Sequence, residues 1–233
     1  MNYIAFSGGV ESRTMALLYG KGAIAVFTDT GSEHEAMYSA LDEVEKRLID
    51  IHKGDFKLIR LKASVPCLGE MVDSVEQYAL KSAFLPGKRE RYCTRLFKIA
   101  PMDAFLKDKG GCTLMIGLNA DEERDGNFGL LSNVNYICPL QDDGLTRNAC
   151  LNLLRANGIE PDFPAYMKRG GCYFCPFKSR TRTRNLSQRT RQNVQWLGLQ
   201  KPSRPKTRSL KSKKWDKEQS DKAIVLSTAH HWQ

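Results

Sequence analysis

The segment from Ser7 to Ser12 has the residue types and spacing of a site for a phosphate group. Gly8 and Gly9 let the backbone turn tightly and approach an anion closely, and the two serines can donate hydroxyl hydrogen bonds to phosphate oxygens. A helix that begins near Ser12 would add unpaired N–H groups and the positive end of its dipole. An ordinary glycine-rich connection between a strand and a helix would have the same composition. The predicted nucleotide-binding loop comprises Ser7, Gly8, Gly9, Val10, Glu11 and Ser12.

Three cysteines form the candidate metal site. Cys172 and Cys175 have the C-x-x-C spacing of metal ligands, and Cys93 is the best third candidate. A tetrahedral zinc site would use these three with one more cysteine or a histidine. A redox-active cysteine pair and simple unligated thiols are the alternatives. A fourth ligand could come from among Cys67, Cys112, Cys138 and Cys150, although Cys112 and Cys150 suit small buried apolar positions better.

An acidic residue and a basic segment could complete the anion site. Asp29 closes a predicted strand, where its carboxylate could hold Mg²⁺ or a ribose hydroxyl, or could instead cap a helix that starts near Glu33. The segment 88–98 is rich in lysine and arginine, which could clamp the phosphates of a nucleotide or of a nucleic acid, or could simply form a solvated face. The candidate anion ligands are Arg91, Arg95, Lys98 and Arg124, the last with an ion pair to Asp121 or Glu123 as its alternative.

The elements that must position these residues alternate along the first 160 positions. Short apolar runs bounded by Gly or Asp predict buried parallel strands, and amphipathic stretches between them predict helices. This alternation is typical of an α/β fold with a doubly wound, mostly parallel sheet. The predicted strands are 3–6, 23–28, 57–61, 113–118 and 135–137, and the predicted helices are 12–19, 33–49, 68–78, 94–107 and 145–157, the last bracketed by Asp143 and Gly158.

Five segments, in order, resemble one known family. They are similar to the phosphoadenosine phosphosulfate reductase-like branch of the adenine nucleotide α-hydrolase, or ATP pyrophosphatase, superfamily. Residues 6–12 resemble its SGGxDS loop, and residues 27–33 resemble its DTG strand end. The other three segments are 91–102 (R-x-C…K-x-x-P), 117–124 (G-x-R-x-x-E-S-x-R) and the closing section with 138–140 and 171–176.

The resemblance implies binding of an adenine nucleotide, either ATP with Mg²⁺ or a sulfonucleotide. It also implies a [4Fe-4S] cluster at Cys93, Cys172 and Cys175, because related sulfur-transfer enzymes hold such clusters with three cysteines. This chain departs from the family pattern at three places. Glu11 stands where Asp is usual, Asn119 stands where Arg is frequent, and no C-terminal Glu-Cys-Gly-Leu-His-like segment is found. Since sulfonucleotide reductases carry their catalytic cysteine in that segment, reduction by that route is disfavoured.

The charge distribution divides the chain into two parts. The net charge is +10, and the segment 178–222 carries 15 of the 36 Lys and Arg residues but only three of the 26 acids. We expect an α/β domain with the small cysteine-containing region at 1–177 and a basic tail at 178–233. The tail interleaves cations with Trp196 and Trp215, which favours binding to tRNA or DNA, although a solubilising tail has the same composition. The longest apolar run is too short to span a bilayer, and seven cysteines without a signal peptide favour the reducing cytoplasm.

Three functions are compatible with these features. The leading hypothesis is an enzyme that cleaves ATP to AMP and pyrophosphate, adenylates its substrate, and transfers sulfur from a donor to a nucleic acid. The first alternative is a sulfonucleotide enzyme like phosphoadenosine phosphosulfate reductase, served by a redox partner. The second is a non-catalytic nucleic-acid-binding protein that senses a nucleotide.

Overall fold

A five-stranded parallel sheet forms the centre of the molecule, with strand order β3-β2-β1-β6-β7. The computed structural model describes residues 1–123, 131–163, 170–173, 175 and 177, so the predicted tail lies outside the described residues. The strands are β1 (Asn2–Phe6), β2 (Ile24–Asp29), β3 (Lys57–Lys62), β6 (Cys112–Met115) and β7 (Val134–Ile137). The predicted α/β fold with a parallel sheet is confirmed.

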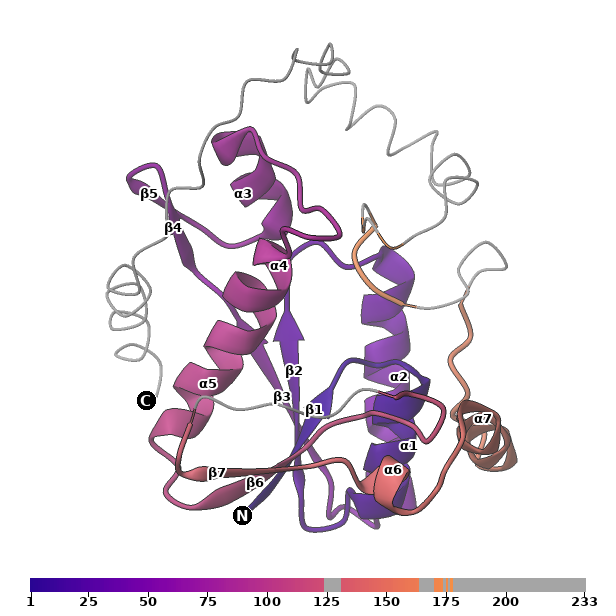
Figure 1. Ribbon diagram of the computed structural model, residues 1–233. Coiled ribbons are helices and arrows are strands. Elements are labelled where there is room, and N and C mark those ends of the chain that lie inside the picture. Colours follow the sequence, from indigo (N-terminus) through magenta and orange to yellow (C-terminus); the bar gives the residue numbers. More distant parts are fainter. Residues whose placement is uncertain (124–130, 164–169, 174, 176, 178–233) are drawn as a thin grey trace.

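Helices cover both faces of this sheet (Figure 1). On one face, α1 contacts α2, α6 and α7, and on the other, α5 contacts β2 and β3. The helices are α1 (Val10–Tyr19), α2 (Glu35–Ile51), α3 (Val75–Ser82), α4 (Tyr92–Thr94), the π-helix η1 (Arg95–Ile99), α5 (Ala100–Lys107), α6 (Pro139–Asp142) and α7 (Arg147–Ala156). Within the described ranges, no helix is long and apolar enough to cross a membrane.

Alternating side chains of the central strand β1 explain why both faces are covered. Ile4 and Phe6 pack into the cluster that includes Met15 of α1, whereas Tyr3 packs into the cluster that includes Leu106 of α5. Successive side chains of a strand point to opposite faces of the sheet. A strand with apolar side chains on both faces must therefore have both faces covered. The near-continuous apolar sequence of β1 therefore places it at the middle of the sheet.

The strand order reverses its direction of winding next to the central strand β1. From β1 the chain winds in one direction to β2 and β3, and then returns to β6 and β7 on the other side. Ligands of open α/β sheets bind where the winding reverses, which here is between β1 and β6. Gly117, just after β6, lies so close to α1 that a Cβ there would be 3.2 Å from Glu11 Cβ and 3.4 Å from Ser12 N. The loop that follows β1 is therefore at the reversal point.

The prediction of a helix over 68–78 is wrong in its first half. Residues there form an antiparallel hairpin of β4 (Val65–Cys67) and β5 (Glu70–Val72), and α3 begins only at Val75. Leu68 and Gly69 both have positive φ, 48° and 86°, and such a pair makes a two-residue turn that a helix cannot contain. Ser74 then caps α3 by accepting a hydrogen bond from Gln77 N at 3.1 Å.

Two predicted element ends also differ from the structure. β6 stops at Met115 rather than at 118, because Leu118 N already bonds to Ile116 O in a turn. α7 is capped by Thr146, which accepts from Ala149 N at 3.2 Å. Asp143, the predicted cap, instead accepts a hydrogen bond from the Tyr19 hydroxyl.

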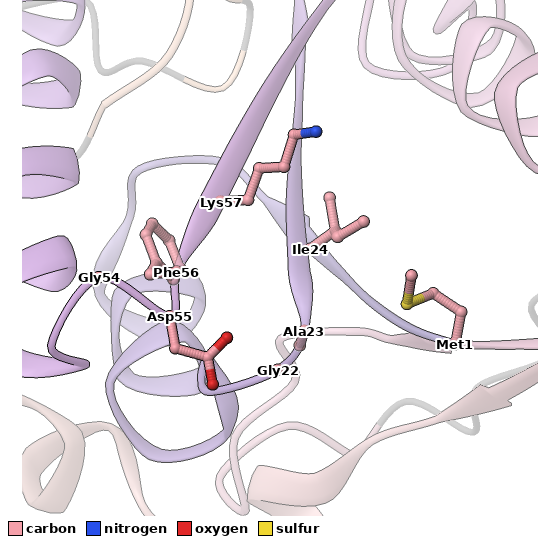
Figure 2. A pocket seen from close by; sticks show the side chains of 8 residues that line it. All are labelled: Met1, Gly22, Ala23, Ile24, Gly54, Asp55, Phe56 and Lys57. Carbon is pink, nitrogen blue, oxygen red and sulfur yellow. The ribbon is translucent and has the colours of Figure 1, made fainter.

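A shallow pocket lies at the opposite, amino-terminal edge of the sheet (Figure 2). Met1, Ile24 and Lys57 line it from the starts of β1, β2 and β3, and Asp55 is its other charged residue. It contains no group of polar side chains that could carry out a reaction. The predicted nucleotide-binding loop lies at the other edge, after the end of β1.

Candidate nucleotide-binding site

The loop after β1 is fixed in its shape by Gly8. Its φ is 71°, in the left-handed region that favours glycine, and a Cβ at this position would lie 3.1 Å from both Leu41 Cδ2 and Met37 Cε. The loop is thus pressed against α2, and a larger residue at position 8 would have to displace the side chains of Leu41 and Met37. The two-glycine pattern correctly predicts the tight turn. Glycine suits position 8 because α2 packs against the loop there.

The first turn of α1 presents unpaired donors beside two hydroxyl groups. Gly9 is the N-cap and gives no side-chain cap, and the first helical hydrogen bond runs from Arg13 N to Gly9 O at 3.0 Å. The hydroxyl oxygens of Ser7 and Ser12 lie 3.2 Å apart, and Ser12 also donates to Gly9 O at 3.2 Å. Helix N–H groups with adjacent hydroxyls at the end of a dipole are what an anion requires. The residues predicted to bind phosphate therefore lie together in an arrangement suited to it.

A buried arginine holds this loop from behind. Arg13, 3% exposed, donates from Nε to Gly8 O at 2.9 Å and from Nη1 to Ile159 O at 3.1 Å. Burial lowers the pKa of Arg13 to about 10 although Glu43 opposes the shift, so the side chain is still charged at neutral pH. Sequence reasoning missed this residue, because nothing in the sequence separates it from the exposed cations of a surface helix.

The acid of the loop, Glu11, is held by residues far away in the sequence. Its Oε1 accepts a hydrogen bond from Asn119 Nδ2 at 3.1 Å and a charged one from Arg147 Nη1 at the start of α7. Asp121 accepts from Arg147 N at 2.8 Å and so fixes the start of α7. Arg147 thus places a guanidinium beside the loop although position 119 carries Asn. No local sequence pattern marks this arginine as part of the site.

Asp29 lies at the end of β2, as the sequence predicts. Its Oδ1 accepts hydrogen bonds from Gly31 N at 2.8 Å and from the Tyr38 hydroxyl at 2.7 Å. The alternative role as a helix cap is wrong, because His34 caps α2 by accepting from Ala36 N. Burial and the hydrogen bond to Asp29 raise the pKa of Tyr38, so its hydroxyl remains a donor.

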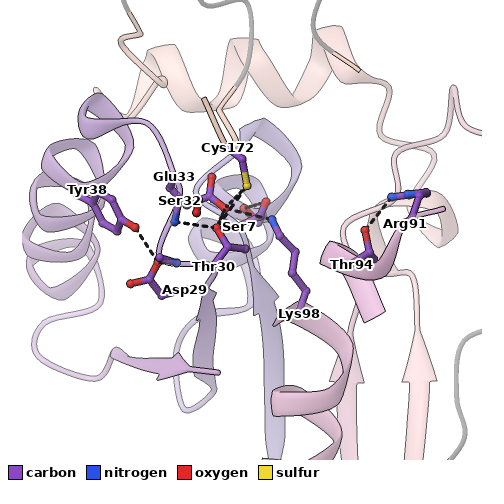
Figure 3. Close-up of polar contacts among 12 residues, drawn as sticks. Ser7, Asp29, Thr30, Ser32, Glu33, Tyr38, Arg91, Thr94, Lys98 and Cys172 are labelled. Atoms are coloured by element: carbon purple, nitrogen blue, oxygen red, sulfur yellow. Dashed lines mark hydrogen bonds and ion pairs between the residues drawn. The ribbon is translucent and has the colours of Figure 1, made fainter. Parts of the chain in front are cut away.

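A buried cluster lies next to this strand end and joins three distant segments (Figure 3). The Glu33 side chain is 2% exposed, and its Oε1 accepts from Thr30 Oγ1 at 3.1 Å and from Lys98 Nζ at 3.3 Å. Cys172 Sγ lies 3.7 Å from the same oxygen and 3.3 Å from Thr30 Oγ1. Glu33 Oε2 is buried and has no partner among the described residues. Lys98 is therefore brought to the site, but it pairs with a carboxylate there.

The cysteine-containing segment is attached to the loop after β2 by backbone hydrogen bonds. His34 N donates to Gly171 O at 3.4 Å, and Tyr173 N donates to Ser32 O at 3.2 Å. Cys172 faces Glu33 in the antiparallel bridge between the two segments. This pairing spans about 140 positions of the sequence, and it explains how Cys172 comes to lie at the carboxyl edge of the sheet.

The charges of this cluster favour a thiol at Cys172. Burial, together with Glu33, raises the pKa of Cys172 to about 12 although Lys98 opposes the shift. Burial lowers the pKa of Lys98, but the Glu33 carboxylate and Cys172 more than offset this effect, and the net shift is upward. At neutral pH the cluster therefore contains the Lys98 ammonium group and the neutral thiol of Cys172.

The predicted metal ligands do not form a coordination sphere as they are placed. All seven cysteines are free, and among the described residues no three His, Cys, Asp or Glu side chains are grouped as metal ligands. Cys93 is half-buried and packs with the apolar cluster around Phe97, whereas Cys175 N donates to Cys172 O at 3.2 Å. Among the described residues, these side chains do not show the ligand geometry of an iron–sulfur cluster or of zinc. The assignment stays a prediction of the sequence.

The other predicted anion ligands are divided between the surface and the undescribed part. Arg91 is exposed, donates to Thr94 Oγ1 at 3.3 Å, and lies 5.1 Å from the centre of the Phe177 ring. Arg95 is exposed in η1, one turn before Lys98. Arg124 lies outside the described residues. Of the three predicted ligands that the structure describes, Lys98 alone is seen to contact the Glu33 cluster.

More than half of this chain matches a known protein family. The phosphoadenosine phosphosulfate reductase domain family matches residues 1–127, which include the loop, Asp29 and Lys98. The uncharacterized nin region protein ORF290 of Escherichia phage lambda is 26% identical over 204 residues, 77% of this chain and 67% of that protein. An uncharacterized protein of Methanocaldococcus jannaschii is 29% identical over 109 residues, which span 45% of this chain but only 19% of that protein. This chain belongs to the phosphoadenosine phosphosulfate reductase-like family of the adenine nucleotide α-hydrolase superfamily, whose members are enzymes that act on nucleotides.

Proposed function

We propose that this protein cleaves ATP between the α- and β-phosphates and adenylates an oxygen atom of its substrate. The observation that carries the proposal is the uncapped start of α1, with the Ser7 and Ser12 hydroxyls 3.2 Å apart at the point where the strand order reverses. Donors fixed in advance stabilise charge that develops on a leaving pyrophosphate without having to reorganise. The loop therefore supports phosphate-transfer chemistry as well as binding.

The proposed reaction has two steps. In the first, the substrate oxygen forms a bond to the α-phosphorus, the bond to the bridging oxygen of the β-phosphate breaks, and pyrophosphate leaves with the electron pair. In the second, hydrosulfide from a sulfur donor adds to the activated carbon, and AMP leaves with the original oxygen. No oxidant or reductant is needed. Mg²⁺ bound to the phosphates would neutralise charge, and Asp29 Oδ2 is the candidate protein contact, since both hydrogen bonds of this carboxylate use Oδ1.

We propose tRNA or DNA as the substrate. The described residues provide exposed cations in the segment 88–95, and the sequence adds a basic tail. Each cation that contacts a backbone phosphate releases condensed counterions, which favours a nucleic acid over a neutral small molecule. Lys98, in contrast, is already paired with the buried Glu33 side chain and contributes little to this attraction.

Product analysis tests this proposal. The full-length protein is incubated with ATP, Mg²⁺ and hydrosulfide, together with tRNA in one series and DNA in another, and AMP and pyrophosphate are measured. We expect the two products in equal amounts and only when the correct nucleic acid is present. Ser12→Ala should reduce their formation, whereas Ser132→Ala, an exposed residue just before β7 at the amino-terminal edge of the sheet, should leave it unchanged. Absence of pyrophosphate in both series, or formation of ADP and phosphate instead, contradicts the proposal.

Reduction of a sulfonucleotide is the second candidate, and the match of residues 1–127 to a phosphoadenosine phosphosulfate reductase domain favours it. The same loop would then bind the phosphates of the sulfonucleotide. Incubation with phosphoadenosine phosphosulfate and reduced thioredoxin distinguishes the two reactions, because only the reductase releases sulfite. Nucleotide-dependent binding of nucleic acid without turnover of either nucleotide would indicate a sensor instead.

A further inference from the structure

Two phenylalanine rings are exposed close to the carboxyl edge of the sheet. The Phe84 and Phe177 residues are 49% and 43% exposed, and Leu85, next to Phe84, is also 49% exposed. Large apolar side chains grouped on a surface mark contact sites more often than single ones do. These rings are therefore candidates for contact with a partner.

Phe84 is held in position although it is exposed. Its N donates to Ala79 O at 3.2 Å, and its O accepts from the Tyr92 hydroxyl at 2.8 Å. The ring centres of Phe84 and Tyr92 are 5.9 Å apart, and Tyr92 in turn lies 4.8 Å from Tyr78. A ring fixed in this way loses little freedom when a partner stacks on it. The exposure of Phe84 is thus a property of an ordered segment.

Cations outnumber acids in the segment that carries Phe84. The segment 84–99 contains five Lys or Arg residues and a single acid, Glu90. Lys88 and Arg89 are exposed and form no ion pair with the described residues, whereas the exposed Arg60 on β3 is paired with both Asp42 and Glu45. The contrast shows that the positive charge of this segment is available to an external anion.

The guanidinium of Arg91 joins the two halves of this surface. Its Cζ lies 5.1 Å from the centre of the Phe177 ring, which is the distance of a cation–π contact. Phe177 follows the segment that pairs with Ser32 and His34, and Lys98, from the same basic stretch as Arg91, reaches Glu33. The rings and cations therefore border the candidate nucleotide site.

We propose that this basic–aromatic surface, made of Phe84, Leu85, Lys88, Arg89, Arg91 and Phe177, binds an unpaired strand of nucleic acid. Successive bases stack on the two rings, and the three cations follow the phosphates, as in other surfaces for single strands. A duplex hides its base faces, so it meets only the cations. The inference rests on the proposed function and makes it more specific, because it names the surface that brings an unpaired base to the nucleotide site.

Binding measurements on the full-length protein without nucleotide test this inference separately from catalysis. Fluorescence anisotropy is recorded for a labelled 20-nucleotide single-stranded RNA, the matching DNA, and a duplex of the same sequence, between 50 and 200 mM salt. We expect the combined variant Lys88→Gln, Arg89→Gln, Arg91→Gln to bind single strands about 10-fold more weakly or worse. The slope of log affinity against log salt concentration should become less steep by about 2, since each phosphate contact on a single strand contributes about 0.7 and three cations are removed.

The aromatic variants separate stacking from charge. Phe84→Ala and Phe177→Ala should each weaken single-strand binding about 5-fold or more and leave duplex binding within about 2-fold. Lys109→Gln is the control for the loss of a cation. Lys109 lies 4.6 Å from the ring centre of Phe105, in a cation–π pair outside the surface. Thermal unfolding confirms that each variant is folded.

Three results would overturn the inference. These are unchanged affinity in the surface variants, an equal loss in Lys109→Gln, and equal losses for single strands and duplex in the aromatic variants. With unchanged affinity, an acidic protein would become the alternative partner of the surface. If the variants lose binding but no pyrophosphate forms, the adenylation proposal fails and this inference stands. If pyrophosphate forms and the variants bind normally, this inference fails and the adenylation proposal stands.

Discussion

At the scale of single residues, two glycines with the same backbone angle differ in what surrounds them. Gly8 has φ 71° and would place a Cβ 3.1 Å from Leu41 and Met37, whereas Gly22 has φ 70° and open space around its Cβ position. An L-residue in the left-handed region costs about 1–2 kcal/mol at either position. Of the two glycines, only Gly8 would also crowd side chains of α2 if it carried a Cβ.

Gly8→Ala and Gly22→Ala therefore form a matched pair. We expect Gly22→Ala to lower the free energy of unfolding by about 1 kcal/mol and to leave ATP affinity unchanged. Gly8→Ala should lower the free energy of unfolding by more than Gly22→Ala does, and it should also weaken ATP binding. Urea unfolding and calorimetric titration with ATP measure the two effects. If Gly8→Ala binds ATP like the unchanged protein, the loop is not the nucleotide site.

The residues of the site divide into those that sequence could predict and those that it could not. Ser12 and Asp29 follow predicted strands closely, so local pattern is enough to place them at one edge of the sheet. Arg147 contacts Glu11 from 136 positions away, and Cys172 contacts Glu33 from 139 positions away. Such pairs depend on how the strands are ordered and on which loops meet, which a single sequence does not encode in any local pattern.

At the scale of elements, α1 and the end of α7 act as one support for the loop. Arg13 joins Gly8 O to Ile159 O inside this support, while Arg155 on α7 makes a paired contact with Glu160 on the surface, with both distances 2.9 Å. The two arginines make similar numbers of hydrogen bonds. They differ in burial, and burial determines how much stability the protein loses when each arginine is replaced.

Arg13→Ala should lower the free energy of unfolding by about 3 kcal/mol, because it leaves two buried carbonyl groups without a charged donor. It should also weaken ATP binding, since Gly8 loses its anchor. Arg155→Ala should lower the free energy of unfolding by no more than about 1 kcal/mol, since exposed ion pairs contribute little to stability. It should leave ATP binding unchanged. Denaturant unfolding of both variants measures the difference. Equal losses in the two variants would show that Arg13 is not the brace of the loop.

The elements themselves were predictable where one pattern was dominant. β1 and β2 are short apolar runs and α2 has a clear amphipathic period, and all three were predicted to within about two residues at each end. The hairpin β4–β5 was not, because its turn depends on a left-handed conformation at Leu68, a residue whose type favours a helix. Local propensity there was overridden by the turn.

At the scale of the whole molecule, the strand order brings the loop, the end of β2 and the cysteine-containing segment to one edge. The loop follows β1, Asp29 ends β2, and Cys172 is held by the loop after β2. The pocket at the opposite edge has no comparable group of residues. A ligand that binds only the folded state stabilises it by mass action, so nucleotide binding at this edge should be visible in the stability of the entire domain.

Calorimetric titration of ATP and of its α,β-methylene analogue, which cannot be cleaved between those phosphates, tests the central claim most directly. The unchanged protein should bind both nucleotides, and Ser12→Ala should raise the dissociation constant about 10-fold to 100-fold, the value of a hydrogen bond to a charged group. Gly22→Ala should bind like the unchanged protein. Equal dissociation constants for the unchanged protein and Ser12→Ala would contradict the account, because the nucleotide would then bind away from the start of α1.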